Sequence, residues 1–120
     1  MEKDDQKIKK FNELERDHFN DEIMINFTKA VWLTSRANYS AQRNMLVEAI
    51  ADFIEAIELK KDHLPAYLGM ALAVTFKEQG NFNEGKKVIE KAPSEMRMGG
   101  KVIITKKDIL KQFEEMMSKK

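Results

Sequence analysis

The sequence predicts an all-α protein of antiparallel helical hairpins, and three observations lead to this prediction. The chain has only two prolines and five glycines in 120 residues, so few positions break a helix. Apolar residues recur at helical spacing along most of the chain. The chain also resembles itself at an offset of 36 residues, as between Ala37 and Ala73. We therefore expect hairpins stacked as a short array, with flanking helices at the N- and C-terminal ends.

Composition indicates one folded domain, residues 1–120, with 42% hydrophobic and 34% charged residues. A net charge of +1 provides no strong field for phosphate backbones or anionic lipid, so we expect no nucleic-acid or membrane partner. The chain has no cysteine, which excludes disulfides, thiolate nucleophiles and Cys-based zinc sites. The charged N-terminus lacks the apolar stretch of a secretory signal, and we expect a cytoplasmic protein.

Five or six helices are expected, each with apolar residues on at least one face. Their predicted ranges are 5–19, 21–39, 42–60, 65–78, 82–92 and 106–118. Short loops force consecutive helices to pack antiparallel. The chain is therefore divided into an N-terminal helix, a first hairpin, a second hairpin, and a loop with a C-terminal capping helix. The bounds of these four parts are 1–20, 21–61, 62–93 and 94–120.

Local signals predict where the later helices begin and end. Pro65 suits the first turn of a helix, and Gly80 suits the stop after it. Thr105, followed three residues later by Asp108, resembles a capping box with Asp in place of Glu. Between these helices, the segment 94–104 is expected to be irregular or briefly extended.

The internal repeat pairs residues that keep their size or their apolar class. The pairs are Leu33 with Gly69, Ala37 with Ala73, Leu46 with Phe82, Ala49 with Gly85, Phe53 with Ile89, and Ala56 with Ala92. Small residues recur where two helices approach closely, and large ones where a gap must be filled. The alternative is a generic helical bundle whose self-similarity is accidental.

This pattern resembles the tetratricopeptide repeat, a helix–turn–helix of about 34 residues with small and large residues at fixed places. The segment Ala49-x3-Phe53-x2-Ala56 is similar to the second-helix motif of that family. The first helix and turn of the next unit are similar to Leu72-Ala73-x2-Phe76-x3-Gly80-x-Phe82-x2-Gly85. The resemblance covers roughly residues 30–93, about half of the chain. It departs from the family in a repeat spacing two residues longer than usual.

The resemblance implies an adaptor or chaperone-like module that binds a protein or peptide segment, in a groove lined by the first helix of each hairpin. It places in that groove Tyr67, Met70, Ala71, Val74, Lys77 and Glu78 of the second hairpin, and Val31, Thr34, Ser35 and Asn38 of the first. The spacing of the apolar members suits an apolar helix or an extended peptide. Two alternatives stay open. The chain's own first or last helix covers the groove, or the apolar stripes serve homo-oligomerisation in a structural self-assembly protein.

We expect neither catalysis nor a cofactor or metal site. The two histidines, His18 and His63, lack a His or Cys partner at ligand spacing, and each is expected to be solvated or to cap a helix. No pair of carboxylates stands out for acid–base chemistry. The Gly99-Gly100 pair lacks the strand, helix and Lys of a phosphate-binding loop.

Overall fold

The computed structural model describes residues 2–118, and the side chains of residues 21–118. The elements of this part of the chain are α1 (Glu2–Gln42), α2 (Leu46–Leu59), α3 (Leu64–Lys77), α4 (Phe82–Glu90), β1 (Glu95–Met98), β2 (Lys101–Thr105) and α5 (Lys106–Ser118). The prediction of an all-α protein with helical hairpins is confirmed. The short pair of strands is an addition to it.

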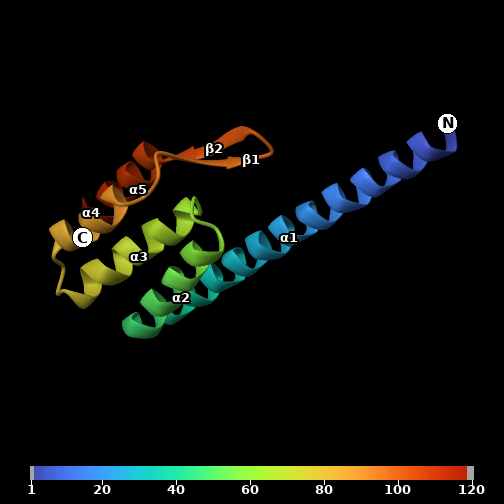
Figure 1. Ribbon diagram of the computed structural model, residues 1–120. Coiled ribbons are helices and arrows are strands. Elements are labelled where there is room, and N and C mark those ends of the chain that lie inside the picture. Colours follow the sequence, from blue (N-terminus) through green and yellow to red (C-terminus); the bar gives the residue numbers. More distant parts are fainter. Residues whose placement is uncertain (1, 119–120) are drawn as a thin grey trace.

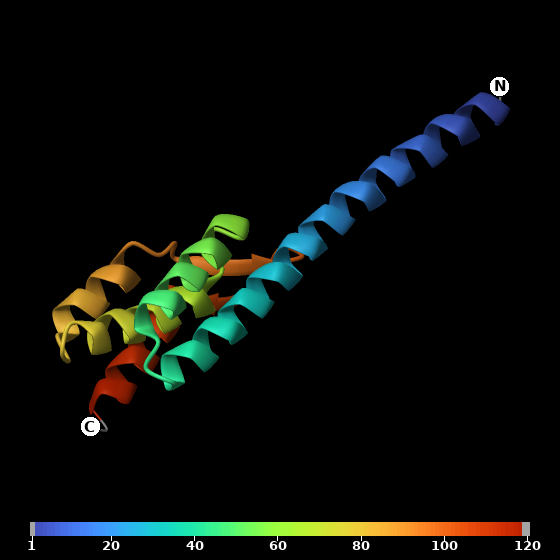
Figure 2. The same cartoon turned by 90° about the horizontal axis from the view of Figure 1, so that it is seen from below.

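The helices form two hairpins and a covering helix, arranged around α3 (Figure 1). The first hairpin is α1 with α2, the second is α3 with α4, and α3 also contacts α1, α2 and α5. Seen from below, α2 and α4 lie on one side of α3, while the C-terminal half of α1 and α5 lie on the other (Figure 2). The first helix of each hairpin, α1 and α3, therefore lies on the same side of the molecule as α5.

Helix α1 is continuous, so the predicted division into helices 5–19 and 21–39 is wrong. No proline or glycine occurs between Glu2 and Gln42, and nothing in the sequence breaks the hydrogen-bond ladder. With a rise of about 1.5 Å per residue, its 41 residues make a helix about 60 Å long. Its N-terminal half projects beyond the other helices, which gives the molecule a longest dimension of 69 Å (Figure 1).

The two hairpins repeat in space with the offset found in the sequence. Helix α2 begins at Leu46 and α4 at Phe82, 36 residues later. The turns before them contain a left-handed residue at Asn44, with φ 63°, and at Gly80, with φ 85°, again 36 residues apart. In five of the six sequence pairs both residues are buried, namely Leu33/Gly69, Ala37/Ala73, Ala49/Gly85, Phe53/Ile89 and Ala56/Ala92. The residues that recur in the sequence thus also occupy equivalent buried positions in the two hairpins.

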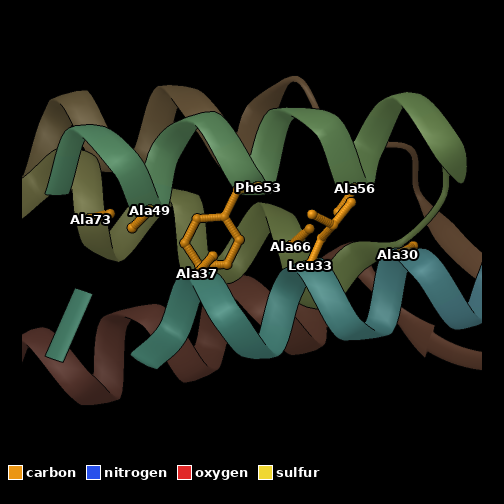
Figure 3. Packing of buried hydrophobic residues seen from close by; sticks show 8 residues of the cluster. All are labelled: Ala30, Leu33, Ala37, Ala49, Phe53, Ala56, Ala66 and Ala73. Atoms are coloured by element: carbon orange, nitrogen blue, oxygen red, sulfur yellow. The ribbon is translucent and has the colours of Figure 1, made fainter. Parts of the chain in front are cut away.

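A first core cluster lies between α1, α2 and α3 (Figure 3). Its buried residues are Ala30, Leu33, Ala37, Ala49, Phe53, Ala56, Ala66 and Ala73. Alanines predominate, so the helices approach closely, and the ring of Phe53 fills the space that remains. A Cβ atom on Gly69 would overlap that ring. Glycine at 69 therefore lets Phe53 lie directly against the backbone of α3.

A second core cluster lies between α3, α4, β1 and α5. Its buried residues are Leu64, Ala71, Ile89, Ala92, Met96, Ile109 and Phe113. The ring of Phe113 from α5 stacks on Phe82 of α4, with centroids 5.0 Å apart. A Cβ atom on Gly85 would overlap Thr75 and lie 2.6 Å from the Phe113 ring. Glycine at 85 thus allows α3, α4 and α5 to meet at one point.

The predicted capping box at the start of α5 is confirmed. The backbone N–H of Thr105 donates to Asp108 Oδ2 at 3.0 Å, and the N–H of Asp108 donates to Thr105 Oγ1 at 3.2 Å. The first of these hydrogen bonds is the main cause that lowers the pKa of Asp108. Helix α5 can therefore begin directly after β2 without an intervening loop.

The segment 94–104, expected to be irregular or briefly extended, forms most of a β-hairpin. Its two-residue turn, Gly99-Gly100, has positive φ at both positions, 59° and 82°, as a type I′ turn requires. The strands pair antiparallel with an irregularity between Met96 and Arg97. The backbone N–H of Arg97 donates to Asp62 Oδ2 at 3.1 Å, which ties the hairpin to the loop between α2 and α3.

Candidate functional site

The candidate site is a groove between α1, α3 and α5, and its floor is one face of α3. The lining residues from α3 recur at helical spacing: Pro65, Leu68, Gly69, Leu72, Ala73 and Phe76. Two of them, Gly69 and Ala73, are small and buried because the first core cluster lies directly behind them. The larger side chains, Leu68, Leu72 and Phe76, thus lie on a helix whose position is fixed by its packing against α2.

The walls come from the C-terminal ends of α1 and α5. Asn38, Ala41 and Gln42 line the groove from α1, and Met116 lines it from α5. The hollow has a volume of about 490 Å³, within the range of sites that hold a small ligand or a few side chains of a peptide. Met116 is 47% exposed and flexible, so this wall can adapt to what the groove holds.

The lining of the groove is mainly apolar and uncharged. None of its lining residues carries an ionisable side chain. The side-chain amides of Asn38 and Gln42 provide both hydrogen-bond donors and acceptors on one wall. Such a surface favours an apolar segment, and its two amides can bond the peptide groups of an extended chain.

A second hollow of about 570 Å³ continues beyond Phe76. Its lining residues are Thr75, Phe76, Gly80, Phe82, Glu114, Met117 and Ser118. Phe76 lines both hollows, and the last turn of α5 contributes Met116 to one and Met117 to the other. The two hollows therefore adjoin at Phe76, and the second one, unlike the first, includes a carboxylate, that of Glu114.

The groove residues predicted on the second hairpin lie mostly on other faces of α3. Ala71 is fully buried in the second core cluster, and the half-buried Tyr67 packs against the same cluster. Met70 packs against the first cluster, on the side of α2. Lys77 and Glu78 are exposed at the end of α3, where their side chains form an ion pair of 3.5 Å.

The two remaining apolar residues of the predicted stripe, Tyr67 and Val74, do not form the groove either. The hydroxyl of Tyr67 donates to the carbonyl oxygen of Lys61 at 3.3 Å, and burial raises the pKa of this tyrosine. Val74 is half-buried and does not line either hollow. The predicted apolar stripe Tyr67, Met70 and Val74 therefore does not form the floor of the groove, which Leu68, Leu72 and Phe76 form instead.

On the first hairpin, the structure places Asn38 in the wall of the groove. Thr34 is buried at 7% exposure, and its hydroxyl donates to the carbonyl oxygen of Ala30 at 2.7 Å. Val31 and Ser35 are exposed but line neither hollow. Of the predicted groove residues, Asn38 alone lines the groove.

Buried His63 differs from the expectation of a solvated or capping side chain. It precedes α3 without a capping hydrogen bond, and both of its ring nitrogens lack a partner among the described residues. Its ring meets Phe27 edge-on, with centroids 6.2 Å apart. Burial, and then the charge of Lys60, lower the pKa of His63. The neutral form is therefore the one that this site favours.

Within residues 21–118, no group of three or more His, Asp and Glu side chains could hold a metal ion. In the part of the chain that the structure describes, no helix is both long enough and apolar enough to cross a membrane. His18 lies outside the residues whose side chains are described.

Comparison of this chain with protein-family models, with curated proteins and with solved structures gives no match. The resemblance to the tetratricopeptide repeat therefore rests on the chain's own residues. Those residues also contain the signal for the groove, because Leu68, Leu72 and Phe76 recur every four positions.

Proposed function

We propose that this protein is a non-catalytic adaptor or chaperone-like module that binds an apolar segment of another protein in the groove between α1, α3 and α5. The observation that carries the proposal is the uncharged lining of a hollow of about 490 Å³, with Asn38 and Gln42 on one wall. A mainly apolar groove of this kind suits the side chains of a peptide, and the two amides suit its backbone.

The packing of the groove supports the proposal. Its floor is held by Phe53 behind Gly69, so binding requires no rearrangement of α3. The adaptable part is the wall, where Met116 is 47% exposed. A rigid floor with one flexible wall allows related sequences to bind at moderate affinity.

The experiment selects ligands for the wild-type protein from a random library of displayed 12-residue peptides and measures their affinities. Met116→Glu introduces a charge into the groove at an exposed position, so the fold should be retained. We expect the dissociation constant of the selected peptides to rise about 30-fold, which corresponds to about 2 kcal/mol at a central contact.

A matched control is Ile54→Glu, since Ile54 is 45% exposed on α2 and lines neither hollow. This variant should bind the selected peptides as the wild type does. Equal affinities for Met116→Glu and the wild type would refute the proposal, as would a selection that enriches only charged peptides.

A further inference from the structure

Among the described side chains of α1, from residue 21 onward, the face opposite the core carries three exposed apolar residues at intervals of seven. Ile25, Trp32 and Tyr39 are 53%, 57% and 59% exposed. Buried residues of the same helix, such as Ala30 and Ala37, lie on its other side. A single exposed tryptophan is ordinary, but a row of three large apolar residues on one helix face indicates a contact surface. We call these three residues the outer stripe.

Arginines hold the aromatic rings of the outer stripe in place. The guanidinium of Arg36 lies 4.5 Å from the centre of the Trp32 ring and forms two hydrogen bonds of 2.7 Å with Asp52 of α2. Arg43 lies over the Tyr39 ring at 5.3 Å and donates to its hydroxyl at 2.7 Å. Because these rings are already ordered, little side-chain entropy is lost when a partner covers them.

Opposite charges stand at the two ends of the outer stripe. Asp21 lies four residues before Ile25, and Arg43 lies four residues after Tyr39. Neither side chain has an oppositely charged partner among the residues that the structure describes. The stripe is therefore acidic at one end and basic at the other, with Trp32 at its centre.

From this arrangement we propose that α1 pairs with α1 of a second copy of the chain, antiparallel and centred on Trp32. Each end residue is 11 positions from Trp32, so Asp21 of one copy lies opposite Arg43 of the other. Ile25 and Tyr39 are each seven positions away and likewise face each other. The surface is self-complementary, as a two-fold interface requires.

The charges distinguish this arrangement from others. A parallel pair would bring like ends together, Arg43 against Arg43 and Asp21 against Asp21, which is unfavourable. The stripe also lies on a different side of α1 from Asn38 and Gln42, which line the groove. Pairing through α1 therefore leaves the groove accessible, and the inference does not depend on the proposed function.

The test measures the mass of the full chain by sedimentation equilibrium over concentrations from about 1 µM to 1 mM. We expect a reversible increase from 14.0 kDa to twice that value. Asp21→Arg and Arg43→Glu each place like charges opposite each other twice per dimer. Each should raise the dissociation constant at least about tenfold. The double variant restores opposite charges at both ends but still lacks the contact between Arg43 and Tyr39, so it should recover most, not all, of the affinity lost in the single variants.

The control for charge alone is Lys111→Glu, an exposed position on α5 with the same change of charge as Arg43→Glu. It should leave the dissociation constant unchanged, and circular dichroism should show that every variant melts as the wild type does. A chain that stays monomeric at all concentrations would overturn the proposal, since the stripe then serves a different partner. A double variant that dimerises no better than the single variants would also overturn it, because the two ends would not meet.

Discussion

Replacement of Gly85 by alanine should destabilise the fold, although alanine is the better helix former. Intrinsic helix propensity favours alanine by about 1 kcal/mol. The added Cβ atom, however, would overlap Thr75, lie 2.6 Å from the Phe113 ring and lie 2.7 Å from the carbonyl oxygen of Ala71. The carbonyl belongs to the backbone of α3 and cannot rotate away, so α3 and α4 must separate.

Overpacking of this kind costs about 2–3 kcal/mol, which exceeds the gain in propensity and leaves a net loss of about 1–2 kcal/mol. For a domain of this size, thermal unfolding followed by circular dichroism should show a midpoint lower by roughly 4–10 °C. Asn83→Ala, at an exposed position of the same helix, should instead leave the midpoint unchanged or raise it slightly. A Gly85→Ala midpoint equal to or above that of the wild type would refute the contact between α3, α4 and α5.

Three further predictions concern the core, His63 and the start of α5. Ala56→Arg, at a fully buried position of the first cluster, should lower the free energy of unfolding by several kcal/mol, whereas exposed Glu58→Arg should change it by less than about 0.5 kcal/mol, as urea unfolding would show. Because burial lowers the pKa of His63 from its ordinary 6.5, the unfolded chain binds more protons below that value, and stability should fall as the pH drops from 7.5 to 5. Replacement by leucine, His63→Leu, should reduce this dependence, and an unchanged slope would contradict the buried neutral ring. Thr105→Ala removes the hydroxyl acceptor of the capping box and should lower the free energy of unfolding by about 1 kcal/mol.

The sequence was sufficient to predict the helices that follow α1 and their local ends. Pro65 lies in the first turn of α3, Gly80 adopts the left-handed conformation after it, and Thr105 pairs with Asp108 as expected. These signals are read from single residues and their near neighbours, because caps and turns depend on local backbone geometry. The offset of 36 residues between α2 and α4 was predictable for a related reason, since like residues recur at like positions.

Two errors arose where a local signal was given the wrong weight. The prediction divided α1 near residue 20, although no proline or glycine lies there to end a helix. The Gly99-Gly100 pair was not recognised as the turn of a hairpin, although two consecutive residues with positive φ are typical of a type I′ turn. The continuous α1 and the hairpin turn are therefore both local features of the sequence.

The position of the groove could not be predicted in the same way. Periodicity shows that α3 is apolar on several faces, but it does not show which face α2, α4 and α5 cover. Tertiary packing decides this, because Phe53 occupies the face of Gly69 that points to α2, and Phe113 covers the region of Gly85 and Ala71. The predicted stripe that includes Met70 and the observed floor that includes Leu72 lie on opposite faces of one helix.

The most direct test of the binding site uses the methionine methyl groups as reporters. Met116 lies in the wall of the groove, Met70 packs on the side of α2, and Met45 is exposed outside both hollows. A selected apolar peptide is titrated into protein labelled with carbon-13 at the methionine methyls, and the NMR signals are followed. If the peptide binds in the groove, the Met116 signal should shift in proportion to occupancy, while those of Met70 and Met45 should stay within error of their free positions. A shift of Met70 without a shift of Met116 would contradict it and would place the ligand on the opposite side of α3.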